Sequence, residues 1–145
     1  MFKKILVPVD GSPTAALAID KAIALAKAFD SAVTAIYVID PYPFTGVGTD
    51  YAYGQAQYLT AATAEANEAI KGAKQTFEAA GVAVKTTLIE GHAVYKGILE
   101  TAESSGADLI VMGSHGRRGI EKWVLGSVAQ RVLSHAHVPV LVVRS

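Results

Sequence analysis

The sequence contains no cysteine, and this absence removes several kinds of chemistry at once. Disulfide bonds, thiolate metal sites and cysteine nucleophiles are all excluded. The chain also has no excess of charge of either sign, because Lys and Arg together number 13 and Asp and Glu together number 13. A general nucleic-acid binder usually carries a clear basic excess, so the composition argues against nucleic acid as a partner. The balanced charge permits self-association, since little long-range repulsion opposes it.

Long apolar runs are missing as well. The apolar stretch that follows the first four residues is only five residues long before Asp10, too short for the apolar core of a signal peptide. No stretch approaches the roughly 20 apolar residues of a membrane-spanning helix. We therefore expect a soluble cytoplasmic protein without a membrane span. The 145 residues, 51% hydrophobic and 18% charged, predict one globular domain over residues 1–145.

Short β-branched runs alternate with helical patterns along the whole chain. Strands are predicted at Ile5–Val9, Ala32–Ile39, Val82–Ile89, Asp108–Met112 and Val138–Val143. Helices are predicted at Ala15–Phe29, Gln55–Ala80, Ala93–Ser105 and Gly126–Ala136. Alternation of this kind predicts an α/β fold in which a parallel sheet lies between helices on both faces, a three-layer doubly wound arrangement.

Polar residues and glycines mark the ends of these elements. Ser12 is a good N-cap, and Pro13 suits the first position of a helix. Gly81 and Gly106 fit the residue just beyond the end of a helix. The tyrosine-rich stretch after the second strand is predicted to be a loop over residues 44–54. Its role stays open between a lid, a contact surface and a partly buried crossover.

A glycine-rich loop follows the fourth predicted strand and leads into the last helix. It reads Gly113-Ser114-His115-Gly116, then nine residues, then Gly126-Ser127. Glycines let the backbone approach a phosphate, and the N-terminus of a helix attracts one. Ser127 is the expected N-cap, and valine at Gly113 and Gly126 is expected to abolish binding while the fold survives. The alternative is that the glycines only form a tight turn between strand and helix.

Asp10 follows the first strand and could face the same ligand. If the first and fourth strands are neighbours, both polar turns lie across one crevice at the carboxyl ends of the strands. The Asp10 carboxylate could accept hydrogen bonds from ribose hydroxyls or face a nucleotide-bound Mg²⁺. It could equally form an Asx turn ahead of the helix cap, and the two roles are compatible.

Other phosphate-binding and hydrolytic patterns do not fit these residues. The glycine loop lacks the Gly-Lys-Ser/Thr ending of a Walker A loop, and Gly46-Val47-Gly48 has Tyr51 in place of the third glycine of a dinucleotide fingerprint. No Gly-x-Ser-x-Gly elbow or His-Glu-x-x-His motif is present. The residues therefore single out no catalytic group and no metal ligand.

Three segments of the chain, taken together, match one known family. They are the glycine pattern from Gly113 to Ser127, the opening Ile5–Ser12 and the closing Val138–Val143. This combination resembles the ATP-binding subgroup of the universal stress protein family. The resemblance implies an adenine nucleotide α-hydrolase-like fold with a five-stranded parallel sheet of strand order 3-2-1-4-5. It also implies a homodimer formed through Val138–Val143, an apolar strand that would otherwise be an exposed edge.

The resemblance also implies where a nucleotide would lie. Adenine is expected near Val38 and the turn from Pro8 to Asp10, with Met112 and Gly113 beside the ribose and phosphates. The phosphates are expected on backbone amides of the glycine loop and the last helix, with room for Mg²⁺ at their outer side. The candidate binding residues are Pro8, Val9, Asp10, Val38, Met112, Gly113, His115, Gly116, Arg117, Gly126, Ser127 and Val128.

These features predict an ATP-binding regulatory or signalling module that responds to nucleotide and stress, with ADP and AMP as alternative ligands. A slow ATPase or self-phosphorylating enzyme is a second hypothesis, because phosphoryl transfer depends mainly on positioning and charge neutralisation. An interaction protein that binds no nucleotide is a third. Neither the protein partner nor the stress signal can be named from these residues.

Overall fold

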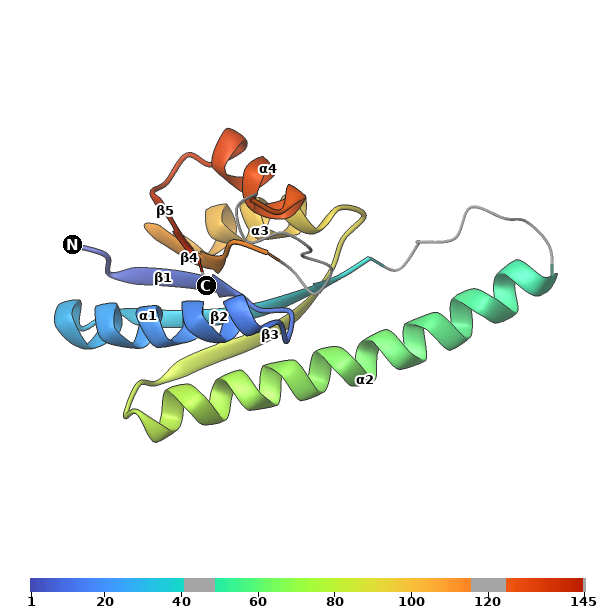
Figure 1. Ribbon diagram of the computed structural model, residues 1–145, viewed down its shortest axis with the longest axis horizontal. Helices are drawn as coiled ribbons and strands as arrows, with labels where there is room; N and C mark the ends of the chain where they lie inside the picture. Colours follow the sequence, from blue (N-terminus) through green and yellow to red (C-terminus); the bar gives the residue numbers. More distant parts are fainter. Residues whose placement is uncertain (41–48, 116–124, 145) are drawn as a thin grey trace.

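Strands and helices alternate along the chain in the computed structural model, which describes residues 1–40, 49–115 and 125–144 (Figure 1). The strands are β1 (Lys4–Pro8), β2 (Ala32–Ile39), β3 (Val84–Glu90), β4 (Leu109–Gly113) and β5 (Val140–Val143). The helices are α1 (Pro13–Phe29), α2 (Thr49–Ala79), α3 (Val94–Ser105) and α4 (Ser127–His135). The predicted alternation is confirmed, and apart from the start of α2 every boundary lies within two residues of its predicted position.

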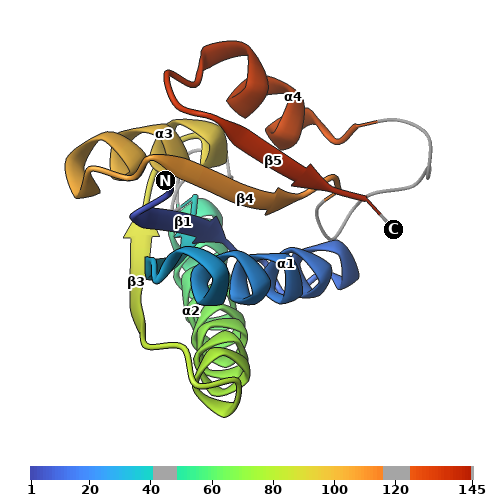
Figure 2. The same cartoon turned by 90° about the vertical axis from the view of Figure 1, so that its left-hand side faces the viewer.

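β1 is the central strand of a parallel sheet with the order β3-β2-β1-β4-β5. Its Ile5 is in register with Val33 of β2 on one side and Leu109 of β4 on the other. The predicted strand order is confirmed, and the first and fourth strands are neighbours. Helices α1 and α2 lie on one face of the sheet and α3 and α4 on the other, which gives the predicted three layers (Figure 2).

Successive residues of β1 face opposite sides of the sheet, and both sides are buried. Ile5 and Val7 belong to one core cluster with Phe77 of α2. Leu6 belongs to a second cluster, which includes Ile98 of α3. A strand that helices cover on both faces needs an apolar side chain at every position. This requirement explains why β1 is apolar from Ile5 to Pro8, whereas Lys4 at its exposed start is charged.

The predicted helix caps are present in the structure. Ser12 precedes α1, and its Oγ accepts a hydrogen bond of 3.2 Å from the backbone N–H of Ala15, while Pro13 is the first helical residue. Gly81 and Gly106 follow α2 and α3 with φ angles of +79° and +69°. Residues with a Cβ rarely adopt these left-handed conformations, so glycine is favoured at both positions.

The start of α2 differs from the prediction. The helix begins at Thr49, so residues 49–54, which were expected to be loop, are helical. The remainder of the predicted loop lies outside the described residues. Gly54 costs a helix only about 1 kcal/mol relative to alanine, and the alanine and glutamine residues that follow favour helix. The first turns of α2 extend past the sheet (Figure 1). Despite the length of α2, none of the described helices is long and apolar enough to cross a bilayer.

The C-terminal part of α2 is anchored by Phe77, whose side chain is fully buried. We expect Phe77→Ala to lower the free energy of unfolding by about 3–5 kcal/mol, because it leaves a cavity in the core. Chemical denaturation followed by circular dichroism measures this change. Glu78→Ala is the matched control at an exposed neighbour and should cost less than about 0.5 kcal/mol. An equally small cost for Phe77→Ala would show that α2 does not belong to the cooperative core.

Candidate functional site

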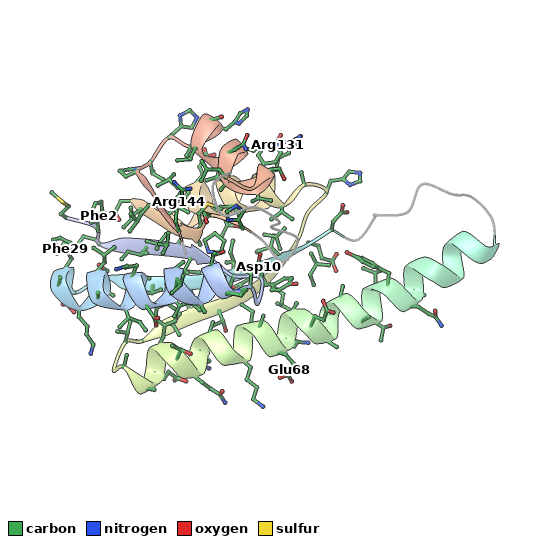
Figure 3. All side chains as sticks on the ribbon, viewed as in Figure 1. Phe2, Asp10, Phe29, Glu68, Arg131 and Arg144 are labelled. Atoms are coloured by element: carbon green, nitrogen blue, oxygen red, sulfur yellow. The ribbon has the colours of Figure 1, made fainter. Side chains whose placement is uncertain are left out.

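A crevice of about 380 Å³ opens at the carboxyl ends of β1 and β4. The strand order reverses here, because the chain runs outward from β1 to β3 and then crosses back to β4. Ligands of parallel α/β sheets bind at such a point. Figure 3 shows Asp10 at this edge of the sheet, beside the start of α1. The crevice is lined by Pro8, Val9, Asp10, Ser12, Ala15, Tyr37, Val38, Val94, Ile98, Met112, Gly113, Ser114, His115, Gly126, Ser127, Val128 and Ala129.

Ten of the twelve candidate binding residues lie around this crevice. The other two, Gly116 and Arg117, lie outside the described residues. The structure therefore brings together residues from four separate parts of the chain, namely β1, β2, β4 with the residues that follow it, and the start of α4. That these residues bind a nucleotide stays a prediction.

Asp10 forms the Asx turn that was one of its two expected roles. Its Oδ1 accepts a hydrogen bond of 2.9 Å from the backbone N–H of Ser12. Between them, Gly11 has a φ of +78°, which glycine adopts without strain. The turn uses one carboxylate oxygen, so the other can still accept a hydrogen bond from a ligand hydroxyl. The structural role and the binding role of Asp10 are thus compatible.

The N-cap of α4 is Gly126, so the expectation that Ser127 caps this helix is wrong. The backbone carbonyl of Gly126 accepts the first helical hydrogen bond, from Gln130 at 3.0 Å, and this makes Ser127 the first residue within the helix. Among the described residues, no side chain forms a cap hydrogen bond at the first turn. Its backbone N–H groups therefore remain available to an anion, and the positive end of the helix dipole adds to the attraction.

Two hydroxyls at the start of α1 hold the chain where it leaves β4. The backbone carbonyl of His115 accepts a hydrogen bond of 2.5 Å from Oγ1 of Thr14 and a longer one of 3.4 Å from Oγ of Ser12. The N–H of Ser114 donates to the carbonyl of Val143 at 2.8 Å. These bonds fix one wall of the crevice. The role of Thr14 was missed, because nothing in its local sequence shows that β4 ends beside it.

Gly113 is required for packing rather than only for ligand access. A Cβ at this position would lie 2.5 Å from Oγ1 of Thr14, 2.7 Å from its carbonyl carbon and 2.9 Å from the backbone nitrogen of Ala15. Two of these atoms belong to the backbone of α1 and cannot move aside easily. Valine at this position would therefore strain the junction of β4 with α1, a cost that the expectation of an unaffected fold did not include.

Another part of the crevice is apolar. Val38 of β2, Ile98 of α3 and Met112 of β4 are buried there and belong to the same core cluster. Gly97 permits this packing, because a Cβ on it would lie 2.9 Å from Cγ1 of Val38. An apolar slot beside a few polar groups is the usual form of a small-molecule site. The lining residues outside the candidate set are Ser12, Ala15, Tyr37, Val94, Ile98, Ser114 and Ala129.

Few charges surround the crevice. Asp10 is the one carboxylate among the described residues that line it, and this lining includes no lysine or arginine. Within residues 1–40, 49–115 and 125–144, no three histidine, aspartate or glutamate side chains are grouped so that they could hold a metal ion. Charge neutralisation of an anion would thus come from backbone N–H groups in this part of the site.

Comparison with known proteins identifies relatives over nearly the whole chain. Residues 1–144 match the universal stress protein family. The chain is 44% identical to a universal stress protein of Methanocaldococcus jannaschii over 144 residues, which cover 99% of this chain and 83% of that protein. The solved structure of universal stress protein UspA from Lactobacillus plantarum has a TM-score of 0.87 and 28% identity, with 99% of this chain and 98% of that chain covered.

Two further solved structures of this fold contain adenine nucleotides. A universal stress protein in complex with cAMP has a TM-score of 0.70 and 24% identity, covering 99% of this chain and 97% of that chain. A universal stress protein from Archaeoglobus fulgidus in complex with dAMP has a TM-score of 0.67 and 21% identity, covering 99% and 98%. At these identities the likeness shows a shared fold.

The contact at Gly113 generates a stability prediction. We expect Gly113→Ala to lower the free energy of unfolding by about 1–3 kcal/mol, because the added methyl group overpacks the junction with α1. Adding Thr14→Ala should not restore the loss, since two of the three close atoms are backbone atoms.

Thermal and urea unfolding of both variants measure this effect. Gly72→Ala is the matched control, because a Cβ there meets nothing within 4 Å, and alanine should stabilise that helix by up to about 1 kcal/mol. Wild-type stability in Gly113→Ala would show that the two elements do not need this close approach.

Proposed function

The chain belongs to the universal stress protein family, and we propose that it binds ATP in the crevice beside Asp10 and acts as a nucleotide-dependent regulatory module. The observation that carries this proposal is the N-terminus of α4, which no described side chain caps, in the same crevice as an apolar slot formed by Val38, Ile98 and Met112. Such a crevice offers an apolar slot for a base and free N–H groups for phosphates.

The lining residues suggest a role for each part of the nucleotide. Val38, Met112 and Ile98 would enclose the adenine. The free oxygen of the Asp10 carboxylate would accept a hydrogen bond from a ribose hydroxyl. The N–H groups of Ser127 and its helical neighbours would bind phosphate oxygens. The cAMP and dAMP complexes of other universal stress proteins support the choice of an adenine nucleotide, and ADP and AMP are the alternatives to ATP.

Magnesium would enter this site with the nucleotide. The described residues offer Asp10 as a single carboxylate in the crevice, too few ligands to hold the ion without phosphates. Mg²⁺ usually keeps several waters and binds through one or two carboxylates plus substrate phosphates. When bound, the ion would neutralise part of the phosphate charge. Without it, the described residues of the crevice would stabilise that charge through backbone N–H groups.

Regulation fits the described groups better than rapid turnover. The single carboxylate of the crevice already accepts a hydrogen bond from the backbone of Ser12, so it is held as a turn residue rather than poised over a water molecule. A slow ATPase is distinguished by incubating ATP with the protein for hours and measuring released phosphate. If the ATP stays intact, the regulatory role is supported. Steady phosphate release that disappears in a variant unable to bind ATP would favour the enzyme.

Proline at the first position of α4 tests the phosphate site. Ser127→Pro removes one N–H, yet proline is favoured there, and Gly126 already has the φ of −64° and ψ of 159° that a residue before proline adopts. We expect ATP affinity to fall roughly 10- to 100-fold in calorimetric titrations with and without Mg²⁺, because a bond to a charged group is lost.

Ser127→Ala is the matched control, since it removes the hydroxyl and keeps the N–H. It should retain more affinity than Ser127→Pro. Equal affinities in wild type and both variants would mean that the phosphates do not lie on α4. A wild type that binds none of ATP, ADP and AMP would end the proposal of nucleotide binding.

We also propose a homodimer formed through β5. This strand pairs with β4 on one side and stands at the end of the sheet order, and Leu141 is 39% exposed on it. An apolar edge strand without a partner invites pairing with another chain. A dimer would join two sheets edge to edge and cover Leu141.

A charge on this edge should separate the two subunits. We expect the wild type to have the mass of a dimer in size-exclusion chromatography with light scattering, and Leu141→Lys to shift toward monomer, because the lysine ammonium would be buried in the interface. Leu17→Lys on α1 is the control, since Leu17 is similarly exposed at 37%. A monomeric wild type, or an equal effect of both variants, would contradict the proposed interface.

A further inference from the structure

One buried polar atom at the crevice has no hydrogen-bond partner. It is Nε2 of His115, and in the described part of the chain no other buried side-chain nitrogen or oxygen lacks a partner. His115 also lines the crevice. Buried polar groups are nearly always hydrogen-bonded, so each exception needs an explanation. A polar ligand atom that belongs in the crevice would supply one.

The contact with Ser114 favours one position for the proton of the His115 ring. The Ser114 side chain is fully buried, and its Oγ lies 2.9 Å from Nδ1 of His115, its one hydrogen-bond contact among the described residues. A buried hydroxyl needs an acceptor, and Nδ1 accepts only when the proton of the neutral ring is on Nε2. With Oγ of Ser114 donating to Nδ1, the unpartnered atom is an N–H donor, and the ligand atom that satisfies it must be an acceptor.

The donor is held in place from two sides. The bond to Ser114 fixes the ring, and the hydrogen bonds from Thr14 and Ser12 to the His115 carbonyl fix the backbone. These contacts limit how far the imidazole can turn toward another partner. A donor that is already fixed in this way loses little further conformational entropy when a ligand binds.

The start of α4 lies next to this donor. The backbone N–H of Gly126 donates to the carbonyl of Ser114 at 2.7 Å, so the uncapped first turn of α4 begins beside the residue that precedes His115. His115 and the start of α4 thus both line the crevice and are linked through Ser114. An anion with several acceptor oxygens can satisfy both through charge-assisted hydrogen bonds and is also attracted by the helix dipole, whereas a neutral adenine or ribose group gains neither advantage.

We infer that Nε2–H of His115 donates to a phosphate oxygen of the bound nucleotide and makes the site prefer phosphorylated nucleosides to adenosine. This inference rests on the proposed nucleotide site. It assigns to His115 the selection of the phosphate, while the apolar residues of β2 and α3 select the base. Ser114 is a positioning residue, because it acts through the imidazole.

Two conservative substitutions separate the two ring nitrogens. In His115→Gln the amide N–H can reach about as far as Nε2, whereas in His115→Asn the amide reaches about as far as Nδ1. We expect calorimetric titration to show ATP affinity within about threefold of wild type for His115→Gln and weaker by about tenfold or more for His115→Asn. Adenosine, which lacks phosphate, should bind all three proteins equally.

The outcomes distinguish this inference from the proposed function. If wild type binds ATP and His115→Asn binds it equally well, His115 does not contact phosphate and the inference fails alone. If His115→Asn loses adenosine as strongly as ATP, the residue has only a structural role, and the inference also fails. If wild type binds no adenine nucleotide, both the proposed function and the inference fail.

The tautomer can be tested without any variant. Long-range ¹H–¹⁵N correlation spectra of the ligand-free wild type should show the proton of His115 on Nε2, and that proton resonance should move downfield when ATP is added. Ser114→Ala should release the ring, so that the other tautomer becomes populated. A proton on Nδ1 in the wild type would overturn the inference, as would an Nε2 proton that does not respond to bound ATP.

Discussion

The close approach of β4 to the first turn of α1 is the contact on which the crevice depends. Gly113 has no side chain, and this lets the end of the strand lie against the backbone of Thr14 and Ala15. At that distance the hydroxyls of Ser12 and Thr14 reach the carbonyl of His115. The junction therefore sets the direction in which the chain leaves the sheet, and the turns after β1 and β4 become two walls of one site.

Much of the fold follows from local sequence. The opening strand is apolar from Ile5 to Pro8 because helices cover both faces of β1, and Gly81 and Gly106 end their helices in conformations that favour glycine. The predicted start of α2 was wrong because the local sequence there contains both loop-forming and helix-forming residues. Gly54 and its tyrosine neighbours resembled a loop, yet the helix already begins at Thr49, because one glycine does not outweigh a long run of helix-forming residues.

The site was predictable where its residues carry a local signature. Asp10 and the glycines after β4 mark strand-to-helix turns, and the structure brings ten of the twelve candidate residues to one crevice, although their binding role is untested. Thr14 and Ile98 have no such signature, because an ordinary helix would also place threonine and isoleucine there. Their proximity to the crevice arises from packing between distant segments. The unpartnered nitrogen of His115 is likewise a property of the assembled fold.

The central position of β1 in the sheet affects how the chain folds while it is being synthesised. The first strand needs β4 as a neighbour, and the hydrogen bond from Lys4 to Asp108 at the base of that pair spans 104 positions. A growing chain can pair β1 with β2 and β3 early, but one edge of β1 stays open until most of the protein has left the ribosome. During that interval the open edge is a surface for chaperones or for aggregation. A ligand of the crevice can recognise only chains that have passed this stage.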